Sequence, residues 1–214
     1  MVSGDQQKML WAGAAVVVLA LLLGAIVFFF GGGAPAFHGA QTIPDPSALP
    51  GLSTGNAPWP AELSQLKARL TAIGLPALSE EGTVLHIHQH LDIFVNGKTV
   101  AVPAGIGIQE AQGFISPIHV HDETGIIHVE SPVVADFTLG QFFDIWGVRF
   151  TATCIGGYCA DDTHSLRVYV NGELSKGDPR DIVLASHQEI VIAYGTDAQI
   201  PANIPSAFAF PEGY

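Results

Sequence analysis

Basic residues are scarce in this chain of 214 residues: 8 Lys and Arg stand against 20 Asp and Glu, for a formal net charge of −12. A protein that binds nucleic acid through its phosphates normally presents a basic surface, so that function is disfavoured. Two cysteines are too few for a small disulfide-dense scaffold. The sequence also lacks a serine nucleophile elbow and a glycine-rich phosphate loop, so neither motif supports an enzyme of those classes.

Charged residues of both signs are few: they make up 13% of the chain, compared with roughly 25% in a typical soluble domain. The uncharged apolar run at 10–30 is long enough for a membrane-spanning helix, which needs about 20 residues. Lys8 precedes this run and the next basic residue is Lys67, so the positive-inside rule places the N-terminus in the cytoplasm. We therefore expect a single-pass membrane protein whose bulk is extracytoplasmic, either periplasmic or at the cell surface.

A cleaved signal peptide is the alternative to this anchor, since Ala34-Pro35-Ala36 is similar to a cleavage site. The apolar run is longer than the about 7–15 residues usual in signal peptides, which favours the anchor. Composition and hydrophobic period divide the whole chain into six predicted segments. They are a cytoplasmic stub at 1–9, the transmembrane anchor at 10–30, a Gly/Pro-rich tether at 31–60, an amphipathic helix and connector at 61–81, a β-rich His-containing domain at 82–196, and an extended C-terminal tail at 197–214.

The β-rich domain has the pattern of antiparallel hairpins. Asn96-Gly97 and Asn171-Gly172 follow alternating runs, and Asn-Gly favours a two-residue turn with positive φ at both positions. A third hairpin is expected around 122–125. Further strands are expected at 148–153, 182–184 and 189–194.

A short helix is expected at about 139–146, where Thr138 and Gln141 have the spacing of a capping box. The predicted fold is therefore mainly β, either a sandwich or a partly open barrel built from antiparallel hairpins. It carries one or two short helices and is preceded by a single transmembrane helix.

Histidine is unusually frequent: the 9 His outnumber the 8 Lys and Arg combined, and most of them fall between residues 86 and 128. Alternate residues of a strand share one face. In the strand expected at 84–95, one face carries His86, His88, His90 and Asp92. The opposite face carries Leu85, Ile87, Gln89, Leu91, Ile93 and Val95, which should meet the core.

The next hairpin repeats this arrangement. Pairing His121 with Ile126 across the turn places His119 directly opposite His128, with Glu130 on the same face. Directly opposed residues have Cβ atoms about 4.5–5.5 Å apart, which lets two imidazoles reach one ion. We therefore expect the two histidine faces to meet around a common metal site.

Imidazole nitrogen suits Zn, Cu, Fe and Ni, and copper or zinc fits an exported site best. The predicted ligands are His86, His88, His90, His119, His121 and His128. Asp92 and Glu130 are expected either to ligate or to orient a ligating imidazole. His38, His164 and His187 lack a converging partner and are expected to be bystanders.

Three functions remain open at this point. The first is a membrane-anchored extracytoplasmic protein that binds copper or zinc. The second is a metalloenzyme with an open His-ligated Zn, Cu or Fe site, performing hydration, hydrolysis or oxygen chemistry. The third is an interaction module whose histidine face responds to pH.

Cys154 and Cys159 flank a Gly-Gly turn, and outside the cytoplasmic membrane a local disulfide is the expected state. A thiolate pair for copper or redox exchange is the alternative. The spacing of His86, His88, Asp92 and Gly97 loosely resembles the first cupin motif, and His86-x-His88 also resembles copper–zinc superoxide dismutases. The remaining ligand spacing of either family does not follow, so the sequence assigns no family.

Overall fold

The computed structural model describes residues 46–214. The predicted anchor at 10–30 lies outside the described residues. Within 46–214, no helix is both long and apolar enough to cross a membrane. The anchor, the cytoplasmic N-terminus and the extracytoplasmic location therefore stay predictions.

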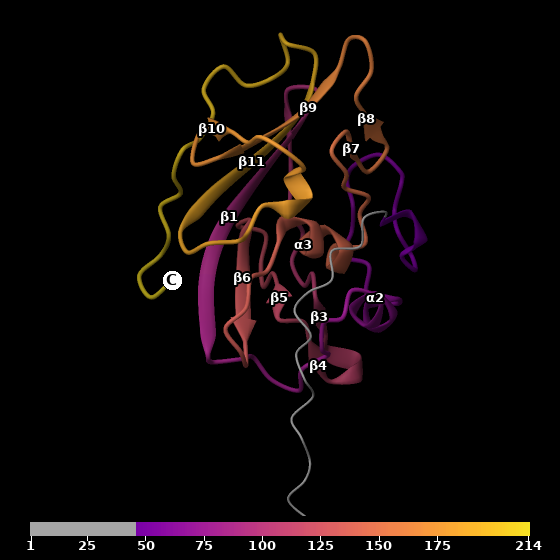
Figure 1. The fold of residues 1–214 in the computed structure, drawn as a ribbon, viewed down its shortest axis with the longest axis vertical. Helices are drawn as coiled ribbons and strands as arrows, with labels where there is room; N and C mark the ends of the chain where they lie inside the picture. Colours follow the sequence, from indigo (N-terminus) through magenta and orange to yellow (C-terminus); the bar gives the residue numbers. More distant parts are fainter. Residues whose placement is uncertain (1–45) are drawn as a thin grey trace, which may run out of the picture. The chain divides into compact units, whose positions relative to one another are not determined.

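The described part of the chain is mainly β, with two short α-helices (Figure 1). In chain order the elements are η1 (Pro46–Ala48), α2 (Leu66–Ala72), β1 (Leu85–Val95), β2 (Lys98–Val100), β3 (Ile108–Gln109), η2 (Glu110–Gln112), β4 (Phe114–Ile115), β5 (Ile118–His119), β6 (Ile126–Ser131), α3 (Leu139–Trp146), β7 (Cys154–Ile155), β8 (Tyr158–Cys159), β9 (Ser165–Val170), β10 (Glu173–Leu174), η3 (Pro179–Asp181) and β11 (Gln188–Gly195).

The main sheet has seven strands in the order β10-β9-β11-β1-β6-β5, with β2 paired to β1. It is mixed, because β1 and β11 run parallel while the other pairs are antiparallel. The prediction of a sandwich or barrel made of antiparallel hairpins is therefore wrong in this respect, and the mainly β prediction is confirmed. A parallel pair needs a long crossover, and here the chain between β1 and β11 contains α3.

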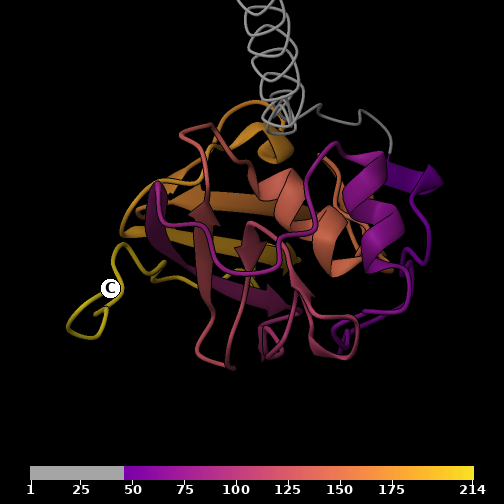
Figure 2. The ribbon, with the colours of Figure 1, turned by 90° about the horizontal axis from the view of Figure 1, so that it is seen from below.

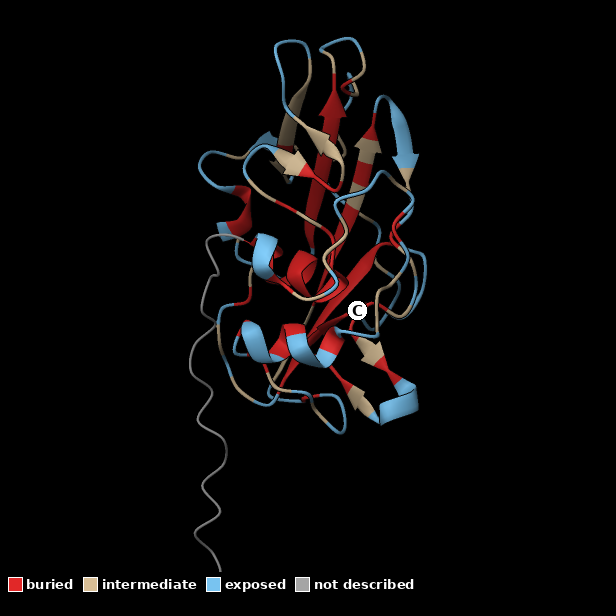
Figure 3. Ribbon diagram, turned by 90° about the vertical axis from the view of Figure 1, so that its right-hand side faces the viewer, coloured by how far each residue is buried: buried red, intermediate tan, exposed pale blue. Residues whose placement is uncertain are grey.

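The core lies between one face of this sheet and the α-helices. Leu91 and Ile93 of β1 are buried on that face, as the alternation predicts. Leu66 and Leu70 of α2 and every residue of α3 are buried beside them. Full burial of such a side chain contributes about 1.5–3 kcal/mol, so this face anchors the sheet. Buried residues are concentrated in the central strands, whereas the turns at the strand ends are exposed (Figure 3).

Both helices begin where local hydrogen bonds place them. Thr138 and Gln141 form the predicted capping box of α3. The helix predicted from residue 61 starts only at Leu66, because residues 64–65 form a turn that hydrogen bonds to Glu62 stabilise. The carboxylate of Glu62 accepts hydrogen bonds from the backbone N–H groups of Ser64 and Gln65.

The predicted turns are confirmed: Asn96, Gly97, Asn171 and Gly172 all have positive φ. The strands predicted at 148–153 and 182–184 are absent from the described chain. Their only ladder contacts are isolated bridges, such as Val148 with Ser53 and Val183 with Thr138. An isolated bridge joins only one pair of residues, so most backbone N–H and C=O groups of these two segments take no part in a sheet.

Part of the segment predicted as a tether lies against the domain. Leu49 and Trp59 are 5% and 2% exposed, within the core. The indole of Trp59 packs edge-on against Trp146 of α3, with ring centroids 5.9 Å apart. Burial of a large aromatic ring is a strong stabilising contribution, so this stretch is held in place by packing.

The predicted disulfide is present between Cys154 and Cys159, which ends the thiolate alternative. It joins β7 to β8 across the turn at Gly156. A Cβ on Gly156 would lie 2.4 Å from the ring of Trp59, so the turn passes the indole at a distance that only glycine allows.

Candidate metal centre

Three neighbouring strands carry the histidines on the sheet face opposite the core. The register places His88 of β1 beside His128 of β6, and His86 beside Glu130. On the other side of β6, His119 of β5 is paired with the same His128. The predicted pairing of His119 with His128 is therefore confirmed, and β6 lies between the two His-x-His pairs.

Each His-x-His pair aims two imidazole nitrogens at one point. The Nε2 atoms of His86 and His88 are 3.1 Å apart, and those of His119 and His121 are also 3.1 Å apart. Two nitrogens bound to one tetrahedral zinc ion at about 2.0–2.1 Å would stand about 3.3–3.4 Å apart. Both pairs therefore have nearly the spacing that a shared ion requires.

His128 and Glu130 complete the cluster between these pairs. The ring of His128 lies 4.5 Å from those of His88 and His121, measured between centroids. The Oε1 atom of Glu130 lies 3.1 Å from Nδ1 of His128 and 3.2 Å from Nε2 of His86. We call these six residues the histidine cluster: His86, His88, His119, His121, His128 and Glu130.

The centre of the histidine cluster is buried and its two ends are open. His119 is fully buried, His128 is 6% exposed and Glu130 is 4% exposed. The side chains of His86 and His121, at opposite ends, are 53% and 41% exposed. An ion arriving from solvent would therefore first meet one of these two imidazoles.

Backbone contacts orient the buried imidazole of His119. Its Nδ1 lies 3.0 Å from the carbonyl oxygen of Ser116, which can only accept, so Nδ1 carries the proton. Nε2 then presents its lone pair towards His121, which is the orientation that a ligating histidine needs. The chain passes close by at Gly107, whose φ is +79° and where a Cβ would lie 2.6 Å from the carbonyl oxygen of Ile118.

His90 lies apart from the histidine cluster, although it belongs to the same face of β1. Its Nδ1 is 2.9 Å from Oε2 of Glu189, and its Nε2 is 3.0 Å from the carbonyl oxygen of Thr124. Burial opposes the charged ring, yet the hydrogen bond and charge of Glu189 raise the pKa of His90 above its ordinary value. His90 therefore belongs to a separate group, with Asp92 and Glu189, whose ligand atoms are close enough together to hold a metal ion of their own. Asp92 stands near this pair rather than near the histidine cluster.

The predicted C-terminal tail covers the histidine face of β1. In Figure 1 it is the yellow segment that ends beside the sheet, and in Figure 2 it lies on a different side of the sheet from α2. Phe208 stacks on His90 with ring centroids 3.8 Å apart, and Tyr214 lies 4.7 Å from His88 and 5.6 Å from His128. The aromatic side chains of residues 197–214 therefore hold the tail against this face.

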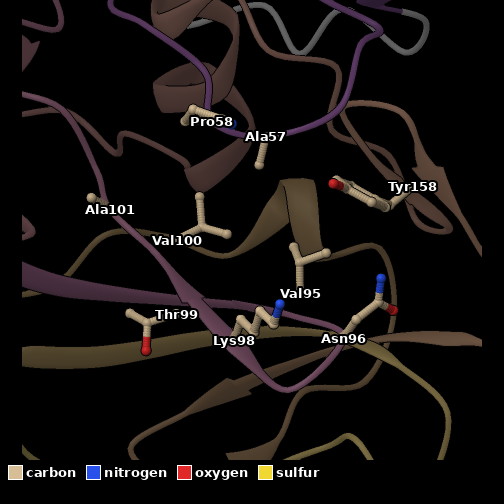
Figure 4. Close-up of a pocket in the computed structure, with 9 residues that line it drawn as sticks. All are labelled: Ala57, Pro58, Val95, Asn96, Lys98, Thr99, Val100, Ala101 and Tyr158. Atoms are coloured by element: carbon tan, nitrogen blue, oxygen red, sulfur yellow. The ribbon is translucent and has the colours of Figure 1, made fainter.

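The described pockets show which part of the histidine cluster opens into a cavity. A pocket of about 470 Å³ borders His121, and its other lining residues are Leu63, Ala104, Gly105, Ile108, Gln109, Glu110 and Ala111. A second pocket, of about 400 Å³, lies at the other end of β1 and contains no histidine or carboxylate (Figure 4). Its lining offers one charged side chain, Lys98, so it holds no set of metal ligands.

Burial shifts the protonation of two cluster histidines. It lowers the pKa of His88 and of His119 to about 4, because the imidazolium loses hydration and faces other imidazoles. Glu130 behaves in the opposite way: burial alone would raise its pKa, but the hydrogen bond from His128 and the surrounding imidazoles hold it below its usual range. At neutral pH, His88 and His119 are therefore neutral nitrogen donors close to the Glu130 carboxylate.

These shifts predict an acid-sensitive fold. An unfolded histidine titrates near 6.5, so from roughly pH 6.5 downwards the unfolded chain binds more protons than the folded chain. We expect the free energy of unfolding of the metal-free protein to fall as pH is lowered from roughly 6.5 to 5, a window above most carboxylate titrations. Urea unfolding in the presence of a chelator measures it, and constant stability across this window would contradict the prediction.

Sequence reasoning missed three contributors to this face. Glu81, from the connector before β1, places its Oε1 3.4 Å from Nε2 of His121. Glu189 reaches His90 only because β11 pairs with β1, a long-range contact with no local signal. Tyr214 belongs to the predicted tail, and no local pattern indicates that its ring lies beside His88 and His128.

Comparison with known proteins adds no assignment. No protein-family model, no curated protein and no solved structure matches the chain.

Proposed function

We propose that this protein binds a transition-metal ion, copper or zinc by preference, through the histidine cluster. The observation that carries the proposal is the convergence of five imidazoles and one carboxylate on one sheet face. They come from β1, from β6, and from β5 with His121 just after it. Strand faces are ordinarily filled by Thr, Ser, Lys and Glu, so this composition needs a chemical cause. Neutral imidazole is a preferred ligand for both metals.

The proposal includes the predicted setting of the site. The apolar run at 10–30 would anchor the chain in the membrane, with the histidine cluster on the extracytoplasmic side. The net charge of −12 would favour the approach of a cation and disfavour nucleic acid. The metal ion and the lipid bilayer are therefore the two partners that we propose.

Metal uptake by the full chain tests this function. We expect chelator-stripped protein to take up zinc or cuprous ion, measured by elemental analysis after gel filtration, and to unfold at a higher temperature when loaded. Ligand at 100 times its Kd stabilises the native state by about 2.7 kcal/mol. His164→Ala is the matched control, because His164 lies outside the histidine cluster, hydrogen-bonded to Asp161 and stacked on Tyr194. Failure to bind either metal, with no thermal shift, would overturn the proposal.

A metalloenzyme is the second candidate, favoured by the pocket beside His121. A catalytic zinc site keeps one position open for water, whose pKa the metal lowers towards about 7. A small substrate in this cavity would lie next to an ion held by His121. Zinc-loaded protein that hydrolyses an activated ester, and loses this activity in His121→Ala but not in His164→Ala, would support the enzyme over a binding protein.

A further inference from the structure

The two His-x-His pairs fall into two separate sets of donor atoms. One set comprises His86 and His88 with His128 and Glu130, and the other comprises His119 and His121 with the same two residues. Within each set the ligand atoms lie within 4.8 Å of one another. Donors around one tetrahedral zinc ion stand about 3.3–3.4 Å apart, so each set needs to contract by only about 1.5 Å to form a single coordination shell.

We propose that the histidine cluster holds two metal ions side by side, with Glu130 shared between them. This inference rests on the proposed metal-binding function and deepens it. His86 and His88 bind one ion, and His119 and His121 bind the other. Each ion therefore has two nitrogen ligands of its own before any group is shared.

Glu130 has the position and the chemistry of the shared ligand. Its Oε1 lies 3.2 Å from Nε2 of His86 and 4.0 Å from Nε2 of His119, so one carboxylate faces both pairs. A carboxylate has two oxygens and can bind two ions at once, whereas a neutral imidazole has one free lone pair. His128, whose ring neighbours those of both pairs, supplies a further nitrogen to one of the ions.

Access from solvent also divides the histidine cluster into two. Each set contains one exposed imidazole, His86 in the first and His121 in the second, with buried partners behind it. Tyr214 packs on His88 and so covers the first set, while the pocket lined by His121 opens beside the second. Two ions would therefore enter from different sides, and neither would have to pass the other.

Binding stoichiometry in the full chain tests the inference. We expect calorimetric titration with zinc alone to reach two ions per chain. The double variant His86→Ala/His88→Ala and the double variant His119→Ala/His121→Ala should each bind one ion, and the quadruple variant none. His164→Ala should retain both, and circular dichroism should show that each variant keeps the wild-type fold.

Cupric ion provides a readout that does not depend on stoichiometry. Two cupric ions bridged by one carboxylate couple magnetically, so the doubly loaded protein should give a reduced or half-field paramagnetic resonance signal. Each double variant should instead show the full signal of an isolated ion. Glu130→Gln should restore two uncoupled signals, or lose one ion, because the amide bridges poorly.

The outcomes separate this inference from the function on which it rests. One ion in the wild type, lost in both double variants, would show that a single ion uses both pairs and would overturn the dinuclear site alone. One ion in the wild type that survives in either double variant would also overturn it. No binding to any form of the protein would overturn the proposed function itself.

Discussion

His128→Ala is expected to weaken zinc binding by the full chain by at least about 100-fold, or about 2.7 kcal/mol. His128 lies between the two His-x-His pairs and belongs to both sets of donor atoms. Loss of a group that merely supports a ligand costs roughly 10- to 100-fold in affinity. Removal of a central imidazole should therefore cost at least the upper end of this range, as measured by competition with a chelator of known affinity.

His128→Ala also leaves a cavity at a buried position, so a second variant must separate lost metal binding from lost stability. His128→Gln keeps polar bulk but removes the imidazole, so it should lose affinity while unfolding near the wild-type temperature. His164→Ala removes a histidine outside the cluster and should bind zinc as the wild type does. If His128→Gln binds zinc with unchanged affinity, His128 takes no part in the site.

Asp144→Ala is expected to lower the free energy of unfolding by about 3–5 kcal/mol, the usual cost of breaking a buried ion pair. Asp144 and Arg180 are 1% and 2% exposed, and the guanidinium contacts both carboxylate oxygens, at 2.8 and 3.1 Å. The pair ties α3 to η3. In the variant, the guanidinium of Arg180 would lose its two contacts with the Asp144 carboxylate. At 2–4 °C per kcal/mol, the unfolding temperature should therefore fall by roughly 6–20 °C.

An exposed ion pair of the same kind provides the control. Asp197 pairs with Arg167, but its side chain is 89% exposed. Exposed pairs contribute about 0–1 kcal/mol, so Asp197→Ala should unfold within a few degrees of the wild type. Equal effects of the two substitutions would show that burial does not amplify the Asp144–Arg180 interaction.

Local rules accounted for the features that depend on short stretches of chain. The alternation in β1 predicted which side chains face the core, the Asn-Gly turns predicted positive φ, and Thr138 with Gln141 predicted the start of α3. The pairing of His119 with His128 followed from the length of one turn. In each case, the interacting groups are close in sequence, so the pattern contains the required information.

Long-range pairing was beyond these rules. The sequence indicated two separate histidine faces that should meet, whereas the structure places β1 directly beside β6, so that His88 and His128 are neighbours within one sheet. The same pairing choice brings β11 to β1 in parallel and gives His90 its partner Glu189. A strand has two edges and many compatible partners, and only the packing of the whole core selects among them.

The sequence by itself determined that the chain carries an excess of histidine and that these imidazoles line strand faces opposite an apolar core. Spacing of two residues on a strand is sufficient for that, because alternate side chains point the same way. Only the tertiary structure decided which imidazoles share a site. The strand order places five of them around Glu130, whereas the sixth, His90, contacts Glu189. The distances between these side chains depend on long-range strand pairing and burial, which local spacing does not determine.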